Sequence, residues 1–348
     1  MFWDLSSDNY LYGYNKEPTN NKNIAGFDLD NTLIKTKSGK TFAINENDWM
    51  FQYDNVKNIL KKYDNYKIII ITNQKGLNSE GKIKTFKNKI EQIANKLDNI
   101  IFEIYAMTQD NLFRKPFPSV FKKIEFDKEN SFYCGDACGR KDDFSDSDIK
   151  FAHNVGIKFY TPENIFLDSK EIIKINYHID FTKKYEKYSY KKNKDKPEVI
   201  IMCGFPACGK SYLAQNIKEN NKNFEIISLD EIKTKAKMKK LILELISKNK
   251  NIIIDNTNID IKSRKYIIDF FDDKYYVRII HFDVSLDVCK HNNNYRYYTQ
   301  NKYVPKIVYN KMNKQYEKPS IKENNKINKI DIIEGFNNDE ILYSQLLV

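Results

Sequence analysis

The chain has 348 residues, of which 41% are hydrophobic and 30% are charged, a balance typical of a globular protein with enough length for two domains. Its 58 Lys and Arg residues outnumber its 47 Asp and Glu residues, and the resulting net charge of +11 favours a polyanionic partner only slightly over an ordinary solvated surface. The sequence has no run of about 18 apolar residues and no apolar signal core, which excludes a membrane-spanning class and predicts no membrane partner.

The cysteines bear on metal binding and on compartment. Cys134 and Cys138 are spaced like a metal-binding pair, but no second pair of Cys or His residues with zinc-ligand spacing lies near them, so zinc is not expected. The total of five cysteines is odd, and Cys203 and Cys208 lie in or beside a glycine-rich loop. We therefore expect reduced thiols and an intracellular, reducing compartment, without distinguishing nucleus from cytoplasm.

The first half of the chain predicts one α/β domain. Residues 1–23 are polar and aromatic and are expected to form an N-terminal arm or a short packed extension. Residues 24–167 then alternate apolar runs with amphipathic segments. Predicted strands cover 24–30, 67–74, 100–107 and 131–136, and predicted helices cover 56–63 and 81–97. This alternation predicts an open, mostly parallel sheet flanked by helices.

A second α/β domain is predicted after a change in composition. Residues 168–196 are rich in Lys and Tyr and end before Pro197, so we assign them to a linker. Residues 197–348 return to the alternating pattern. Predicted strands in this part cover 199–203, 224–230, 251–258 and 275–283. The predicted fold class is therefore α/β, with two domains that each contain an open, mostly parallel sheet.

Two aspartates mark the first candidate site. Asp28 and Asp30 follow an apolar run in FDLDNTL, and a spacing of two directs both side chains to the same side of a strand. Two converging carboxylates repel each other unless a cation lies between them, and Mg²⁺ prefers such oxygen ligands. One carboxylate could then attack phosphorus while the other transfers protons. An exposed acidic turn is the alternative for this motif alone.

Polar residues at the ends of later predicted strands support a phosphatase site. Thr72 and Asn73 offer a hydroxyl and an amide for phosphate oxygens, and Lys115 offers a fixed positive charge for a charged intermediate. Asp136 follows the apolar run at 131–136. Open α/β sheets bind ligands at the carboxyl ends of their strands, so we expect these side chains to share one pocket.

This set of residues resembles the haloacid-dehalogenase-like phosphatases. The resemblance implies that Asp28 is the nucleophile and Asp30 the general acid and base. It also implies that Thr72 and Lys115 bind phosphate, and that Asp136 joins the two aspartates in holding Mg²⁺. Three further acidic residues follow in KDDFSDSD, namely Asp143, Asp146 and Asp148. One of them could orient a metal-bound water or Lys115, but a solvated surface is an equal interpretation for each.

A phosphate-binding loop marks the second candidate site. The sequence GFPACGKS fits the pattern G-x-x-x-x-G-K-[ST] between a predicted strand and a helix-like segment. Its eight residues are the predicted ATP-binding residues Gly204, Phe205, Pro206, Ala207, Cys208, Gly209, Lys210 and Ser211. In such a loop Lys210 reaches the β- and γ-phosphates and Ser211 holds Mg²⁺. The pattern predicts binding of a nucleoside triphosphate but does not identify the phosphate acceptor.

Three charged residues are candidates for the transfer step. Asp230 ends one predicted strand and could accept a proton from an attacking hydroxyl, while Asp255 ends another and stands where a Walker-B-like acid is expected. Strand position alone leaves both acids open as the base; the family resemblance given below favours Asp230 and keeps Asp255 as the alternative acid. Arg296 lies in a polar segment, where it could stabilise charge from a mobile lid or could be an ordinary surface residue.

With both sites present, residues 20–337 resemble the polynucleotide kinase 3′-phosphatase family. The matching stretches include FDLDNTL, ITNQKG, FRKP, CGDACGR, GFPACGKS and IDNTN. The resemblance implies hydrolysis of DNA 3′-phosphates, with RNA ends as a further option, and ATP-dependent phosphorylation of 5′-hydroxyls. Asp28 and Asp30 would catalyse the first reaction, and Asp230 and Arg296 would serve the second. A downstream ligase is an expected partner.

The sequence departs from the family pattern in three places. The first 23 residues are too few for the phosphopeptide-binding domain that members often carry, so none is expected here. Leu229 stands where an Arg often precedes the kinase aspartate, and Asn294 stands at the first of two lid arginines. Lys233 or Lys290 could compensate.

These departures keep other functions open. The main alternative is a 3′-phosphatase whose weak or inactive kinase half binds nucleotide and DNA. A small-molecule kinase fused to a small-molecule phosphatase and an end-binding scaffold with two decayed sites are further alternatives. The basic excess argues weakly against the former, and the intact catalytic residues argue strongly against the latter.

Overall fold

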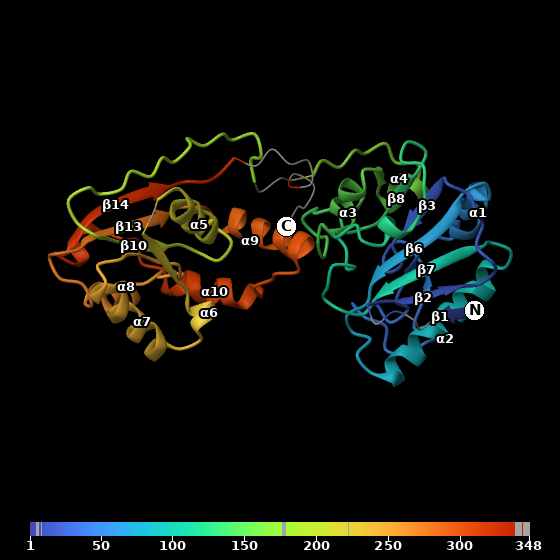
Figure 1. Cartoon of the computed structure of the whole chain (residues 1–348). Coiled ribbons are helices and arrows are strands. Elements are labelled where there is room, and N and C mark those ends of the chain that lie inside the picture. Colours follow the sequence, from blue (N-terminus) through green and yellow to red (C-terminus); the bar gives the residue numbers. More distant parts are fainter. Residues whose placement is uncertain (5–6, 8, 176–178, 222, 338–342, 344–348) are drawn as a thin grey trace. The chain divides into compact units, whose positions relative to one another are not determined.

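The structure is a computed structural model that describes the chain except residues 5–6, 8, 176–178, 222, 338–342 and 344–348 (Figure 1). The chain divides into two compact units, Met1–Tyr177 and His178–Ser344, and each unit is described by itself. Among the described residues, no helix combines the length and the apolar character that crossing a bilayer requires.

The first unit is built on a sheet that, within the described residues, has the strand order β1-β2-β7-β6-β3-β8-β9. The strands are β1 (Phe2–Asp4), β2 (Leu11–Tyr14), β3 (Ile24–Phe27), β6 (Lys67–Asn73), β7 (Phe102–Met107), β8 (Phe132–Cys134) and β9 (Lys158–Tyr160). The five strands from β7 to β9 are parallel, whereas β1 and β2 extend the sheet as an antiparallel edge. The N-terminal residues expected to form an arm thus contribute two strands to this sheet.

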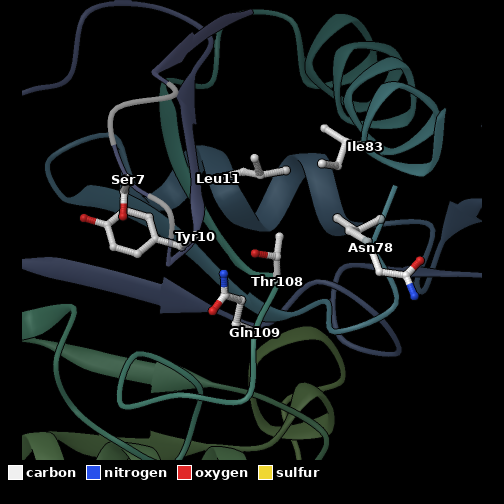
Figure 2. Close-up of a pocket in the computed structure, with 8 residues that line it drawn as sticks. Ser7, Tyr10, Leu11, Asn78, Ile83, Thr108 and Gln109 are labelled. Carbon is white, nitrogen blue, oxygen red and sulfur yellow. The ribbon is translucent and has the colours of Figure 1, made fainter. Parts of the chain in front are cut away.

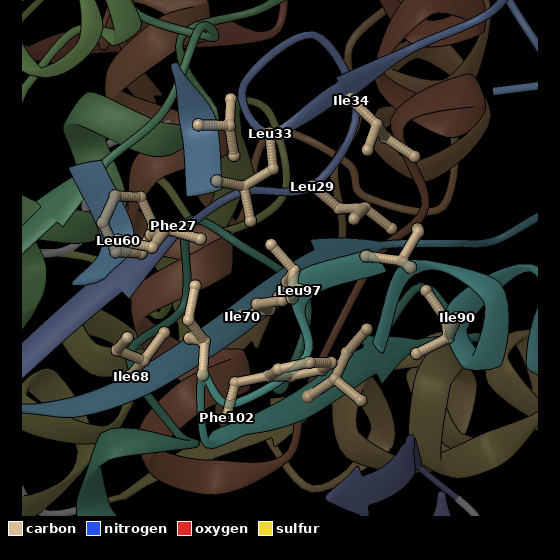
Figure 3. Close-up of a cluster of buried hydrophobic side chains, with 14 of the residues drawn as sticks. Phe27, Leu29, Leu33, Ile34, Leu60, Ile68, Ile70, Ile90, Leu97 and Phe102 are labelled. Carbon is tan, nitrogen blue, oxygen red and sulfur yellow. The ribbon is translucent and has the colours of Figure 1, made fainter. Parts of the chain in front are cut away.

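Helices cover both faces of the first sheet because its central strands β3 and β6 contain consecutive apolar residues. Ile68 and Ile70 of β6 pack with α2 (Glu80–Leu97) in one core (Figure 3). Ile69 and Ile71 pack with α3 (Ser147–Val155) in another. Successive side chains of a strand point to opposite faces, so a continuous apolar run requires two covered faces. The smaller elements are β4 (Ile34–Lys35), β5 (Met50–Phe51), α1 (Val56–Leu60), η1 (Lys61–Tyr63), η2 (Phe121–Lys123) and α4 (Pro162–Phe166).

The second unit contains a parallel sheet with the order β11-β12-β10-β13-β14 among the described residues. Its strands are β10 (Glu198–Cys203), β11 (Phe224–Ile227), β12 (Asn251–Ile254), β13 (Tyr276–Phe282) and β14 (Ile327–Ile333). Its helices are α5 (Lys210–Asn220), α6 (Leu229–Ile232), α7 (Lys235–Ser247), α8 (Ile261–Ile268), α9 (Leu286–Gln300), α10 (Lys306–Gln315) and the short η3 (Ile321–Glu323). One core packs α7 and α8 on the sheet and the other packs α5, α9 and α10.

Part of the segment assigned to a linker packs on the second unit. The Tyr188 hydroxyl donates to Asp331 at 2.9 Å and the Tyr190 hydroxyl donates to Glu198 at 2.7 Å. Both tyrosines also pack against the core that contains α5. The aromatic composition of this segment, which distinguishes it from a flexible spacer, explains why it packs on the second unit.

Candidate active sites

An acidic cluster lies at the carboxyl ends of neighbouring strands in the first unit. Asp28 directly follows β3, Asp136 follows β8, and Asp148 lies in the first turn of α3. One ligand oxygen from each of these three carboxylates lies within 4.8 Å of the others. Because β3 and β8 are adjacent and parallel, their carboxyl ends meet at the same edge of the sheet. The sequence placed Asp28 and Asp136 correctly at this edge.

Lys115 supplies the positive charge of the cluster. Its Nζ lies 2.6 Å from Asp28 Oδ1 and 2.7 Å from Asp148 Oδ1, and it also donates to the Tyr133 hydroxyl at 2.8 Å. Tyr133 in turn donates to the carbonyl of Ile71. Lys115 and Asp148 are almost completely buried, at 4% and 1% exposure. A buried lysine with three oxygen partners has a fixed position and keeps its charge.

The balance of charge in the cluster fits a divalent cation. Burial raises the pKa of Asp28 well above its usual range, and Asp148 and Asp136 offset the opposing effect of Lys115. Burial and the nearby Asp148 raise the pKa of Asp136 to about 6. Three carboxylates near one ammonium group leave an excess of negative charge in a largely buried site. Carboxylate oxygens are the donors that hard divalent ions prefer.

The side chain of Asp30, expected to be a metal ligand, lies outside the cluster. Its carboxylate accepts a hydrogen bond from Gln74 Nε2 at 2.6 Å and lies 3.6 Å from Lys89 Nζ. The backbone turns immediately after it, because Asn31 adopts a φ of 58°. About half of the Asp30 side chain stays exposed, and Gln74 holds it in place.

Asn73, expected to bind phosphate, instead holds the backbone of Lys115. Its Oδ1 accepts from Lys115 N at 3.0 Å, and its Nδ2 donates to Lys115 O at 3.1 Å. Both polar atoms of the amide are therefore used in positioning the lysine. Thr72 is buried at the end of β6, where its hydroxyl accepts from Gln74 Nε2 at 3.0 Å.

The three acids of KDDFSDSD have different environments. Asp148 is buried and belongs to the cluster, and its Oδ2 accepts from Ala137 N at 3.1 Å. Asp143 organises the preceding loop by accepting from the backbone of Cys138 and Arg140. Asp146 forms an ion pair with Lys150 at 2.5 Å. Only the packing of α3 against the sheet distinguishes Asp148 from its neighbours, so composition alone could not select it.

The second unit places the glycine-rich loop between β10 and α5. Ala207 and Gly209 adopt positive φ angles of 60° and 103°, and these bring the loop back toward the start of α5. Lys210 Nζ donates to the carbonyls of Gly204 at 3.0 Å and Phe205 at 2.6 Å. The lysine is thus folded over the loop that it would share with nucleotide phosphates. The predicted strand, loop and helix context of this motif is confirmed.

Two acids approach the start of α5 from neighbouring strands. Asp255 follows β12 and forms a hydrogen bond with the Ser211 side chain, and burial raises its pKa. Asp230 lies in α6, after β11, and is exposed and close enough to Asp255 to affect its titration. The half-buried acid is therefore bonded to the serine of the loop, and the exposed one is accessible to a substrate.

The segment that carries Arg296, expected from its polarity to be a mobile lid, forms the long helix α9. Asn292 Nδ2 donates to the Ala207 carbonyl at 2.9 Å, which anchors this helix to the P-loop. Arg296 donates to Asn293 Oδ1 at 3.2 and 2.9 Å, and Asn293 also bonds the backbone of Val304. Lys290, a candidate substitute for a missing arginine, pairs with Asp287 at 3.2 Å.

Sequence reasoning missed several residues that position these sites. Gln74 and Lys89 hold Asp30, Tyr133 holds Lys115, and Asn292 holds the P-loop. Gln74 directly follows Thr72 and Asn73, so its place in the sequence could have indicated that it belongs to the site. The other three depend on contacts between residues that are far apart in the chain.

A separate pocket of about 460 Å³ lies in the first unit (Figure 2). Ser7 and Tyr10 from the N-terminal segment line it together with Thr108 and Gln109, which follow β7. None of the clustered acids lines this pocket. The N-terminal segment therefore completes a concave surface in addition to extending the sheet.

The folds and sites define two classes of enzyme domain in one chain. The first unit has the parallel sheet and the aspartate–lysine cluster of a haloacid-dehalogenase-like phosphatase. The second has the sheet and glycine-rich loop of a P-loop kinase.

Comparison with known proteins identifies the family. A family model described as "Polynucleotide kinase 3 phosphatase" matches residues 23–166, and an AAA domain model matches residues 199–319. The bifunctional polynucleotide phosphatase/kinase of Schizosaccharomyces pombe is 36% identical over 339 residues, covering 92% of this chain and 82% of that protein. A putative bifunctional polynucleotide phosphatase/kinase of Acanthamoeba polyphaga mimivirus is 33% identical, covering 93% and 88%.

A shorter relative matches the first part of the chain. The polynucleotide 3′-phosphatase of Saccharomyces cerevisiae is 30% identical over 207 residues, covering 41% of this chain and 87% of that protein. Because the two longer relatives match nearly the whole chain, this chain belongs to the bifunctional polynucleotide phosphatase/kinase family.

Proposed function

We propose that this protein heals broken nucleic-acid ends by hydrolysing 3′-phosphates in its first unit and phosphorylating 5′-hydroxyls with ATP in its second. The observation that supports this proposal most strongly is the presence of both a buried aspartate–lysine cluster and a glycine-rich loop in one chain. The names of the full-length relatives describe the same pair of activities.

In the phosphatase reaction, Asp28 attacks the phosphorus of the terminal phosphate. The bond between phosphorus and the 3′-oxygen breaks, and that oxygen takes a proton from Asp30. Asp30 then removes a proton from water, which attacks the aspartyl-phosphate, releases inorganic phosphate and restores the Asp28 carboxylate. Lys115, 2.6 Å from Asp28, stabilises the negative charge that develops on phosphate oxygens.

The metal of this site is proposed to be Mg²⁺, held by Asp28, Asp136 and Asp148. The fit rests on three clustered carboxylates, of which Asp28 and Asp148 are buried and Asp136 is half-buried, and on their excess negative charge. A bound divalent ion supplies electrostatic stabilisation of the phosphate oxygens. Lys115 and the backbone N–H of Ala137 hold Asp148 in place from either oxygen.

In the kinase reaction, Lys210 exchanges its loop carbonyls for the phosphates of ATP. Asp230 accepts the proton of the attacking 5′-hydroxyl, and Asp255 orients Ser211, the proposed Mg²⁺ ligand in this site. The exposure of Asp230 and the hydrogen bond of Asp255 to Ser211 support this division of roles. Arg296 stabilises the charge on the transferred phosphoryl group from α9.

The proposed substrates are DNA ends in strand-break repair, followed by sealing by a ligase. The net charge of +11 supports a polyanionic substrate. We assign residues 24–167 to the phosphatase domain, together with the N-terminal strands, and residues 197–348 to the kinase domain. The five cysteines are free and buried, which supports the proposed reducing, intracellular compartment.

One incubation tests the proposed function. The chain is mixed with Mg²⁺, labelled ATP and an oligonucleotide that carries a 5′-hydroxyl and a 3′-phosphate, in separate DNA and RNA forms. We expect label at the 5′ end and release of inorganic phosphate, and both to stop when EDTA removes the metal. Release of phosphate without 5′ label would leave a phosphatase with an inactive kinase unit. An oligonucleotide with a 3′-hydroxyl controls for phosphate released from ATP.

A further inference from the structure

An aromatic side chain from the segment that follows β14 lies directly on the P-loop. The ring of Phe336 packs so closely on Gly209 that a Cβ added to the glycine would overlap it. Phe336 also makes an edge contact with Tyr212 of α5, with ring centroids 6.2 Å apart at 81°. On its other side it meets Phe282 of β13 at 5.9 Å. The P-loop, α5 and β13 therefore meet at this ring.

The position of Phe336 is fixed by contacts on both of its chain neighbours. Gly335 packs so closely against the Tyr185 ring that a Cβ would overlap it. Asn337 Oδ1 accepts from Tyr185 N, and Asn337 Nδ2 donates to Tyr185 O, each at 2.9 Å. The peptide of Tyr185 thus clamps the residue that follows Phe336, and the aromatic ring is held at a defined point on the P-loop.

The aromatic surface is only partly covered. Phe336 is 37% exposed and Tyr212 is 72% exposed, although both are large side chains with apolar rings. Gly209 precedes Lys210 and Tyr212 follows Ser211, so the two rings lie beside the residues that would hold the triphosphate. A nucleotide whose phosphates fill the loop would have its uncharged base close to this surface. Aromatic rings offer a base a stacking partner without requiring hydrogen bonds.

We propose that Phe336, with Tyr212 at its edge, stacks on the base of the bound nucleoside triphosphate and so contributes to donor binding by the kinase site. This inference rests on the proposed kinase function. It assigns to the segment after β14 a role in binding the donor nucleotide, whereas the P-loop binds the phosphates. Packing of Phe336 on Gly209 to stabilise the loop is the competing role.

Binding of ATP and of inorganic tripolyphosphate, each with Mg²⁺, separates these roles by calorimetry on the full chain. A stacked base contributes to the first affinity and not to the second, so Phe336→Ala is expected to weaken ATP binding on the order of tenfold and to leave tripolyphosphate binding unchanged. Phe336→Trp, which keeps a stacking surface, is expected to retain ATP affinity. Phe144→Ala removes another exposed phenylalanine, in the first unit, and serves as the matched control.

The outcomes are distinct. Equal weakening of ATP and tripolyphosphate by Phe336→Ala would overturn the proposal in favour of a loop-stabilising role, and no weakening of either would overturn it outright. If the unaltered chain bound neither ligand, the proposed kinase function itself would fail. The Phe336→Trp variant adds a second readout. Its extra emission, measured against the two native tryptophans, should change on adding ATP and not on adding tripolyphosphate.

Discussion

At the scale of single residues, the phosphatase cluster depends on a close approach between Gly135 and Asp148. A Cβ added to Gly135 would overlap the Asp148 carboxylate, whose two oxygens contact Lys115 and Ala137 N. The glycine is therefore required by space at this point of the loop after β8. Any side chain here must displace the carboxylate or the helix that carries it.

The substitution Gly135→Ala tests this requirement. We expect it to lower 3′-phosphatase activity at least about tenfold and to raise the Mg²⁺ concentration needed for half-maximal activity, because Asp148 is displaced from the cluster. Phosphatase rates across a Mg²⁺ titration measure both effects.

Gly81→Ala is the matched control, since a Cβ at that position meets nothing within 4 Å. Unchanged metal dependence in Gly135→Ala would contradict the assignment of Asp148, and equal losses in both variants would indicate a general sensitivity to glycine substitution.

The residues of the sites differ in how far sequence could predict them. Asp28, Lys115 and Lys210 lie in motifs whose spacing and flanking strands are visible in the chain, and their positions agree with those motifs. Asn73 lies in such a motif too, but its amide is used by the Lys115 backbone. Asp148 could not be separated from Asp143 and Asp146, because burial depends on packing between distant segments.

At the scale of elements, a buried ion pair connects α8 to the segment before β14. Arg264 donates from Nε and Nη2 to the two carboxylate oxygens of Glu323, each at 2.7 Å. Its Nη1 donates to the carbonyl of Asn258, whose side chain bonds the Met202 carbonyl of β10. Arg264 is fully buried, so its charge requires the Glu323 carboxylate as a partner. Through Asn258, this ion pair also supports the loop after β12 and the end of β10 that leads into the P-loop.

The substitution Glu323→Ala should destabilise the second unit by about 3–5 kcal/mol, because it leaves a buried guanidinium without its carboxylate. Denaturant unfolding followed by circular dichroism should show an earlier transition. Both tryptophans, Trp3 and Trp49, lie in the first unit, so the transition seen by tryptophan emission should not move.

The exposed pair of Glu244 and Lys248 provides a control for this measurement. Both side chains are about half exposed or more, so Glu244→Ala should barely move the unfolding transition. A loss from Glu323→Ala as small as that from Glu244→Ala would show that the Arg264 pair does not stabilise the unit.

Sequence patterns predicted the central elements better than the peripheral ones. The apolar runs within β6 and β10 and the mostly apolar β13 were recognisable, because strands covered on both faces carry apolar residues at successive positions. The strand β14 was missed, since INKIDII at the sheet edge mixes exposed and buried positions. The helix α9 was also missed, because its polar run HNNN resembles a loop.

For the molecule as a whole, the net charge of +11 bears on whether the substrate is a nucleic-acid strand or a small metabolite. Exposed lysines on α7, including Lys237 and Lys239, follow closely after Asp230 of α6. Cations beside the proposed acceptor site can displace counterions from a nucleic-acid strand but gain little from a small phosphorylated metabolite.

Salt dependence of binding therefore distinguishes a polynucleotide from a small substrate. We expect the affinity for a 5′-hydroxyl oligonucleotide to fall with salt along a log–log slope steeper than about −2, which corresponds to about three phosphates contacted on a single strand. Fluorescence anisotropy at several salt concentrations provides the measurement. A nearly flat response would favour a small-molecule acceptor.

We expect the two phosphorus-handling sites of this chain to act independently, and complementation between two variants tests this. On an oligonucleotide with a 5′-hydroxyl and a 3′-phosphate, Asp28→Ala should retain 5′ phosphorylation and reduce 3′ hydrolysis to less than about a thousandth, and Lys210→Ala should do the reverse. An equimolar mixture of the variants should then process both ends. Loss of both activities in either variant would contradict independent sites.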